Sequence, residues 1–199
     1  MRFISAATKK IEKIVRGNPL LFKIYARPYK KTVKREINLA EISSDDTILN
    51  IGCGALPFTA YFMSTYTRAE IIAVDYDPEI LSSARRCLQQ NLPAERARNI
   101  QVVNMSGVEA VRNLDFSIVM AALQTENKVD ILRELCRSGI EKWRYITREP
   151  RNGLEGEYDS LSSAISPHGR IDQYFPTFDC SVLYTAKSCS EWERNSDDF

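Results

Sequence analysis

The sequence predicts an α/β domain built on a mostly parallel sheet, and two observations support this fold class. From Thr47 onward, short apolar runs alternate with amphipathic stretches, which is the pattern of repeated strand and helix units. The chain has 199 residues, of which 44% are hydrophobic, and this is enough to bury a core on both faces of such a sheet. We therefore expect one domain with a short appendage.

Six apolar segments have the length of strands, and three amphipathic segments between them have the length of helices. The strands are predicted at 47–51, 71–75, 100–104, 116–121, 144–148 and 180–187. The helices are predicted at 58–66, 78–90 and 128–138, the second of them opened by a proline. The segment 150–167 is rich in glycine, proline and polar residues, so we expect a loop that can cover a site.

Positive charge is concentrated at the N-terminus. Residues 1–36 carry eleven basic and two acidic side chains, a net charge of +9, which leaves −8 for the rest of a chain of net charge +1. We expect 1–46 to form a basic helical extension, 47–189 the sheet domain and 190–199 an acidic flexible tail. Residues 1–16 are interpreted as a solvated helix at the domain edge, with a membrane-surface helix or a transit segment as the alternative.

The cysteines show neither a CxxC motif nor paired spacing. They are Cys53, Cys87, Cys136, Cys180 and Cys189. This pattern predicts free thiols in a reducing compartment, so we expect a cytoplasmic protein with no disulfide framework and no metal site. The sequence also shows no apolar run long enough to span a bilayer and no secretory signal.

Two glycines follow the first predicted strand. In Gly52-Cys53-Gly54, the missing Cβ atoms let the backbone approach a ligand at the start of a helix. Asp75 ends the second strand about twenty residues later, where a carboxylate can accept both hydroxyl groups of a ribose. Dinucleotide sites use a third glycine beneath the pyrophosphate, but here the chain continues as ALPFT with Pro57. The turn therefore disfavours a pyrophosphate.

On these residues the chain resembles the class I S-adenosylmethionine-dependent methyltransferases. LNIGCG matches their first motif and AVDYDPEIL matches their acidic second motif. The resemblance spans roughly Thr47 to Lys187 and implies a Rossmann-like sheet of seven strands with the last strand antiparallel. It also implies that S-adenosylmethionine is the cofactor, with Gly52, Cys53 and Gly54 beside its methionine part and Asp75 at its ribose.

The same resemblance implies further contacts to the cofactor. Tyr76 would lie against the adenine, Asn104 near its amino group, and Met105 beside it as an apolar neighbour. Ala121, at the end of the fourth predicted strand, completes the expected set. For Tyr76 and Met105, plain packing is the alternative.

A narrower resemblance is to the nicotianamine synthases. GCGALPFTA is similar to their GSGPLPLTS, and MAAL followed by ENKV is similar to their AAL and lysine-rich helix start. Those enzymes transfer the aminocarboxypropyl group of S-adenosylmethionine rather than its methyl group. Their helical N-terminal domain is longer, and the catalytic acid that it carries cannot be placed here. Pro28-Tyr29 resembles their PY motif, which makes Tyr29 a candidate catalytic residue, with a surface tyrosine as the alternative.

A base is needed only if the acceptor is protonated. The candidates expected at the carboxyl edge of the sheet are Glu126, Glu149 and the single histidine, His168, each with a solvated charge or a capped turn as the alternative. We predict an S-adenosylmethionine-dependent transferase and favour a methyltransferase of a small molecule. The alternatives are aminocarboxypropyl transfer and a non-catalytic binding module, and nucleic acid is a less favoured acceptor. The oligomeric state is not predicted.

Overall fold

The computed structural model describes residues 15, 18–154, 156–161 and 165–189. The strands in this part of the chain are β1 (Thr47–Ile51), β2 (Glu70–Asp75), β3 (Ile100–Asn104), β4 (Ile118–Ala121), β5 (Arg144–Pro150), β6 (Gly169–Asp172) and β7 (Phe178–Thr185). The helices are α2 (Pro19–Ala26), α3 (Tyr29–Leu39), α4 (Phe58–Thr67), α5 (Pro78–Asn91), α6 (Ala94–Arg98), α7 (Gly107–Asn113) and α8 (Lys128–Arg137).

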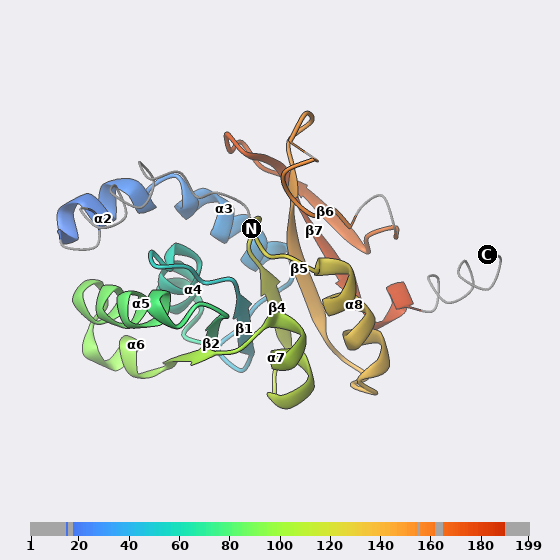
Figure 1. Ribbon diagram of the computed structural model, residues 1–199, viewed down its shortest axis with the longest axis horizontal. Helices are drawn as coiled ribbons and strands as arrows, with labels where there is room; N and C mark the ends of the chain where they lie inside the picture. The colour runs from blue at the N-terminus through green and yellow to red at the C-terminus, as the bar shows by residue number, and fades with distance from the viewer. Residues whose placement is uncertain (1–14, 16–17, 155, 162–164, 190–199) are drawn as a thin grey trace.

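The seven strands form one sheet in the order β3-β2-β1-β4-β5-β7-β6. The pairs from β3 to β5 are parallel, whereas β7 runs antiparallel to both β5 and β6. Helices α4 and α5 lie on one side of this sheet and α7 and α8 on the other (Figure 1). The predicted sheet, mostly parallel with an antiparallel last strand, is confirmed.

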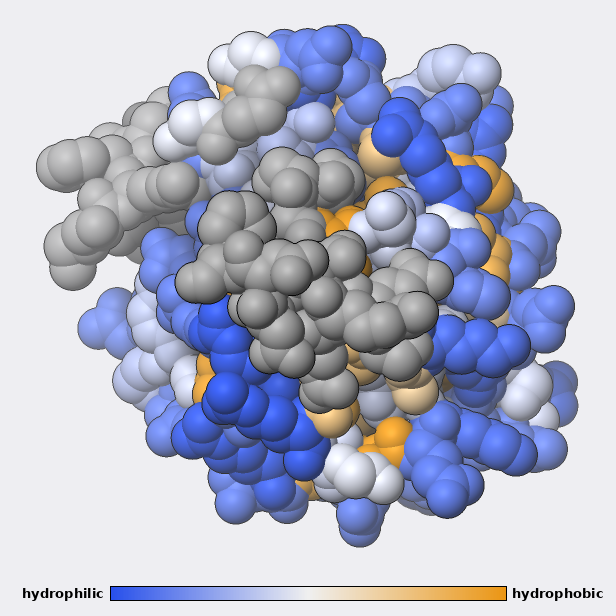
Figure 2. All heavy atoms as spheres, turned by 90° about the vertical axis from the view of Figure 1, so that its right-hand side faces the viewer, coloured by the Kyte–Doolittle hydropathy of each residue, from blue (hydrophilic) through white to orange (hydrophobic). Residues whose placement is uncertain are grey.

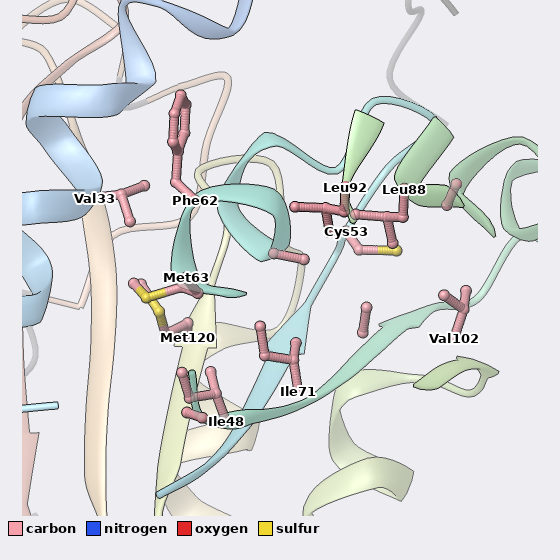
Figure 3. Close-up of a cluster of buried hydrophobic side chains, with 14 of the residues drawn as sticks. Val33, Ile48, Cys53, Phe62, Met63, Ile71, Leu88, Leu92, Val102 and Met120 are labelled. Carbon is pink, nitrogen blue, oxygen red and sulfur yellow. The ribbon is translucent and has the colours of Figure 1, made fainter. Parts of the chain in front are cut away.

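Alternation along the strands divides the interior into two cores, one on each face of the sheet. In the first core, Ile48 and Met120 from the strands pack with Val33 of α3 and with Phe62 and Met63 of α4 (Figure 3). The second core fills the space between the sheet and α7 and α8. Because both faces are covered, the central strands are apolar on both sides, which explains the nearly continuous burial of β1 and β4.

The basic N-terminal extension is joined to the sheet by a buried ion pair. Arg148 on β5 donates from Nε and Nη2 to the two carboxylate oxygens of Glu36 on α3, at 2.8 and 2.9 Å. The Ser181 hydroxyl on β7 donates to Glu36 Oε1 at 2.8 Å, and Arg148 Nη2 also donates to Thr59 Oγ1 at 3.1 Å. Glu36 is fully buried, so α3, α4, β5 and β7 meet at one charged pair.

Helix α2 begins with a side-chain cap and a proline. Asn18 caps the helix, because its side-chain oxygen accepts the backbone N–H groups of Leu20 and Leu21 at 2.9 and 3.2 Å, and Pro19 begins the first turn. The predicted helix over 1–16 and the acidic tail at 190–199 lie outside the described residues, apart from Val15. The division into three regions therefore stays a prediction.

The expectation that the cysteines form no disulfide is wrong for one pair. Cys136, in the last turn of α8, is bonded to Cys189, just beyond β7, with their Cα atoms 5.5 Å apart. The two cysteines are 53 residues apart in the sequence, so no local spacing rule could find the pair. Cys53, Cys87 and Cys180 are free and buried.

Among the described residues, we find no helix with the length and apolar character needed to cross a bilayer. On the face shown in Figure 2, hydrophilic side chains predominate outside the grey atoms, and apolar side chains occur there only in small separate patches.

We expect Arg148→Ala to lower the free energy of unfolding by about 3–5 kcal/mol, because it leaves the Glu36 carboxylate buried without its cation. The matched control is Arg151→Ala, which breaks a half-exposed pair with Asp179 and should cost no more than about 1 kcal/mol. Urea unfolding followed by circular dichroism measures both values. Similar losses in the two variants would show that the buried pair does not hold α3 to the sheet.

Candidate functional site

The glycine turn lies at the carboxyl edge of β1, between the ends of β2 and β4. Gly52 and Gly54 both have left-handed backbone angles, with φ of +71° and +68°. The N–H groups of Gly52 and Cys53 donate to the Val74 carbonyl at 2.9 and 3.1 Å, which ties the turn to the end of β2. This backbone path needs glycine at both positions, in agreement with the motif.

The two glycines differ in what lies in front of them. A Cβ atom added to Gly52 would lie 2.8 Å from Thr125 Oγ1, so this glycine lets the loop after β4 pack against the turn. Thr125 in turn donates its hydroxyl to the Ile51 carbonyl at 3.1 Å. A Cβ atom added to Gly54 would meet no atom within 4 Å. Gly54 is therefore the position where the turn faces open space that a ligand can enter.

Asp75 directs its carboxylate toward this turn. Its Oδ2 accepts the Gly54 N–H at 3.0 Å, and its Oδ1 accepts the Asp77 N–H at 3.2 Å. A carboxylate oxygen has two lone pairs, so each of these oxygens keeps one acceptor position for a ribose hydroxyl. The side chain is mostly buried, and the two backbone bonds fix its orientation. The predicted ribose-binding group thus lies beside the predicted methionine-binding turn.

The residues expected around an adenine lie at the ends of β2 and β3. Asn104 is paired with Asp75 in the parallel register, and its amide nitrogen donates to the Asp75 carbonyl at 3.0 Å. The Met105 N–H donates to the same carbonyl at 3.1 Å, and its side chain packs on the second core. Tyr76 is 75% exposed and is not packed in either core. Its ring is therefore available to a planar ligand.

The end of β4 closes the other side of the turn. Ala121 is buried and pairs with Ile51 and Thr147, and the Ala122 N–H donates to the Ile51 carbonyl at 3.1 Å. Lys128, which the nicotianamine synthase resemblance includes, does not point to this turn. It is fully buried, and its Nζ donates to the carbonyls of Arg148 and Asp159 at 3.1 and 2.8 Å. It fixes the loop after β5 and does not contribute to the site.

Cys53, between the two glycines, is a poor nucleophile. Burial, and after it the nearby Asp75 carboxylate, together raise the pKa of its thiol to about 12. A thiol in this environment stays protonated at neutral pH and does not attack an electrophile. Its contribution to the turn is therefore its backbone N–H and its small apolar side chain.

Tyr29 lies next to the residue that begins the helix after the turn. Its ring centroid is 5.0 Å from that of Phe58 and 4.7 Å from that of Phe175, and the Arg148 guanidinium lies 5.9 Å from it. Burial raises the pKa of the Tyr29 hydroxyl, although Arg148 acts in the opposite direction. The structure thus brings the PY tyrosine to the carboxyl edge, in a half-buried aromatic group.

The three predicted bases have different surroundings. Glu149 is buried and accepts hydrogen bonds from the Ser160 hydroxyl and from the Leu161 N–H, the latter at 3.2 Å, so it anchors the loop after β5. Glu126 is exposed in the loop before α8. The expectation for His168 is wrong. Its N–H pairs with the Leu183 carbonyl at 2.8 Å, beside a cavity of about 510 Å³ at the opposite, amino edge of the sheet.

Three residues that shape this edge were not predicted from the sequence. Thr125 lies behind Gly52, whereas Phe58 and Phe175 enclose the Tyr29 ring. Phe58 carried a signal, since it directly follows the turn in GCGALPF. Phe175 carried none, because it comes from the loop between β6 and β7, and β6 itself was not predicted. A contact between segments this far apart in the chain has no local pattern.

The chain is similar in sequence to a curated transferase. No family model matches the chain. A curated relative is the L-histidine 2-aminobutanoyltransferase of Yersinia pestis, which is 25% identical over 141 residues, covering 68% of this chain and 49% of that protein. The chain therefore spans about half the length of this relative.

Two solved structures show the fold. A mutant of the nicotianamine synthase MtNAS in complex with S-adenosylmethionine superposes with a TM-score of 0.72 and 18% identity, over 88% of this chain and 70% of that one. The Salinibacter ruber RNA methyltransferase in complex with S-adenosyl-L-homocysteine gives 0.60 and 15% identity, over 78% and 90%. The predicted Rossmann-like methyltransferase fold is confirmed by these similarities. The individual site residues stay predictions.

We expect Gly54→Val to abolish S-adenosylmethionine binding, because its side chain would fill the open space before the turn. The matched control is Gly139→Val, since Gly139 has nearly the same φ, +70°, and also has no atom within 4 Å of an added Cβ. Both variants carry similar backbone strain, so calorimetric titration separates strain from loss of the binding space. Equal binding by the two variants would exclude the turn from the site.

We expect Asp75→Asn to weaken S-adenosylmethionine binding by about 10- to 100-fold, because a charge-assisted hydrogen bond contributes about 1.5–3 kcal/mol. The free energy of unfolding should also fall by about 1–3 kcal/mol, because the amide nitrogen cannot accept the backbone N–H that one carboxylate oxygen accepts now. Asp45→Asn, at an exposed position before β1, is the control and should bind normally. Unchanged affinity in Asp75→Asn would remove this carboxylate from the ribose role.

Proposed function

We propose that this chain binds S-adenosylmethionine at the carboxyl edge of β1, β2 and β4 and uses it as a group donor. The observation that carries the proposal is the contact between Gly54 and Asp75. The turn presents open space at Gly54, and the carboxylate beside it retains an acceptor position on each oxygen. These features suit a ligand with a ribose and a flexible amino acid chain. The fold shared with MtNAS supports the same choice.

In this arrangement each end of the donor has its own residues. Asp75 would bind the ribose, and Tyr76 with Met105 and Asn104 would contact the adenine. Gly52, Gly54 and Ala121 would surround the methionine part. The sulfonium supplies an activated electrophile when the donor is bound, so the protein must mainly align an acceptor with one of its carbons.

Among the possible groups, we favour the aminocarboxypropyl group, which reverses the preference drawn from the sequence. Support comes from the aminobutanoyltransferase relative and from the likeness to MtNAS. The position of Tyr29 at the site edge, where the PY resemblance expects it, points the same way. In this reaction an acceptor nitrogen forms a bond to the γ-carbon of the methionine part. The bond from that carbon to sulfur breaks, its electron pair stays on sulfur, methylthioadenosine leaves, and the nitrogen releases a proton.

The residues of the site can assist this transfer in limited ways. Because burial raises the pKa of Tyr29, its hydroxyl stays protonated at neutral pH and can donate a hydrogen bond to an acceptor. Phe58 and Phe175 exclude water from its ring. Glu126, which is exposed, can take the proton released by the acceptor. Glu149 accepts hydrogen bonds from the Ser160 hydroxyl and the Leu161 N–H, so we assign it to anchoring the loop after β5.

Methyl transfer to a small molecule is the second candidate. It uses the same donor site, and the likeness to the RNA methyltransferase from Salinibacter ruber supports it. The two reactions differ only in which carbon beside the sulfonium faces the acceptor. A small-molecule acceptor is proposed for both, with nucleic acid as the less favoured class.

Product analysis decides between the two. Incubation with S-adenosylmethionine and a panel of amines and imidazoles, including L-histidine, should release methylthioadenosine, and S-adenosylhomocysteine would instead show methyl transfer. Tyr29→Phe should lower the turnover and leave donor affinity nearly unchanged, whereas Tyr174→Phe, at an exposed tyrosine near β6, should alter neither. Donor binding without either product, across the whole panel, would contradict a transferase and favour a binding module.

A further inference from the structure

The first two described helices present a surface that combines cations with exposed apolar side chains. We name it the α2–α3 surface, and its members are Leu20, Lys23, Ile24, Arg27, Lys30 and Lys31. Leu20 and Ile24 are 67% and 55% exposed, and all four cations are exposed. Figure 1 shows α2 at one end of the molecule. Exposed aliphatic side chains of this size, grouped on a charged helix, indicate a contact surface.

The helical spacing places four of the members on one side of α2 and its C-cap. Residues 20, 23, 24 and 27 are three and four positions apart, so their side chains share one face of the helix. The opposite face is anchored, because Phe22 is fully buried with its ring centroid 5.0 Å from that of Phe58 and 5.1 Å from that of Tyr61. Leu20 and Ile24 are therefore held outward by a fixed helix.

The charge of this surface has one sign. From residue 18 to residue 35 the chain contains six basic and no acidic residues, and the next acid, Glu36, is buried and paired with Arg148. Lys34 and Arg35 make cation–π contacts, the first with the Tyr66 ring and the second with the Tyr174 ring. The four remaining cations make no ion pair with another described residue. Their charge is therefore available to an anionic partner.

We propose that the α2–α3 surface docks on an anionic lipid bilayer, with Leu20 and Ile24 inserted at the headgroup level and the four cations against lipid phosphates. The combination of cations with exposed aliphatic side chains favours a lipid bilayer over other anionic partners. Cations alone fit any polyanion, but exposed aliphatic side chains gain free energy only from an apolar environment, which a bilayer interface supplies and a nucleic acid backbone does not. Tyr25, 47% exposed on the same helix, suits the interface as well. This is surface attachment, in keeping with the short helices.

Vesicle co-sedimentation of the full chain tests the proposal. Two vesicle types are compared at about 0.1 M salt, where the screening length is about 10 Å: pure phosphatidylcholine, and phosphatidylcholine with phosphatidylglycerol. We expect binding to the anionic vesicles only, falling as salt rises. The double substitution Lys30→Gln and Lys31→Gln should lower the partition coefficient by about 30-fold, since each cation near the surface contributes about 5-fold. The control, Arg86→Gln with Arg98→Gln, removes two exposed cations elsewhere and should bind normally.

The apolar contribution is tested separately. Ile24→Asp should abolish vesicle binding, and Ile24→Trp should strengthen it, while the thermal transition and S-adenosylmethionine affinity stay unchanged in both. That readout is independent of the proposed transferase, so the two hypotheses can fail separately. Equal binding of Ile24→Asp and the wild type, or equal binding to both vesicle types, would overturn the proposal. Two further results would overturn it in a chain that does not bind anionic vesicles. One is binding of an RNA oligonucleotide, and the other is self-association of the wild type that Ile24→Asp abolishes.

Discussion

The arrangement of this protein depends on the buried ion pair between Glu36 and Arg148. Glu36 is fully buried and Arg148 almost fully, and such a pair is tolerated only when its polar atoms find partners. The partners come from four elements, α3, α4, β5 and β7, so satisfying the charges also fixes these elements relative to one another. Arg148 additionally lies over the rings of Tyr29 and Phe178. An extension that looks separate in sequence is thereby made part of the wall of the site.

Local signals account for what the sequence predicted well. The strands β1 and β3 agree with their predicted ranges residue for residue, and α5 differs by one residue at its end, because period, proline and turn signals all lie within the segments themselves. The same holds for the turn with Gly54 and for Asp75, whose roles depend on the ends of two adjacent strands. The number of seven strands and the antiparallel last strand came from family resemblance, which carries information that a single segment lacks.

The errors have a different physical origin, since each depends on contacts between distant segments. β6 is a short edge strand of sequence GRID, with no apolar alternation to reveal it. His168 was expected at the wrong edge because, without β6, the path of the chain after residue 150 could not be traced. The Cys136–Cys189 bond joins a helix end to a strand end, and the positions of both are set by the whole fold. Glu149 looked like a free base because its partners, Ser160 and Leu161, lie in a loop.

The disulfide has a topological consequence for this sheet. Its covalent ring includes all of β5, β6 and β7, together with the long loop after β5. If a protease cuts any one peptide bond within that ring, the two pieces stay joined through sulfur, and the three strands cannot leave the sheet as a fragment. A gel run without reductant would show one band of unchanged mass, and reductant would split it into two. The part of the molecule that covers the carboxyl edge is thus protected against the loss of its strands, although its backbone can still be cut.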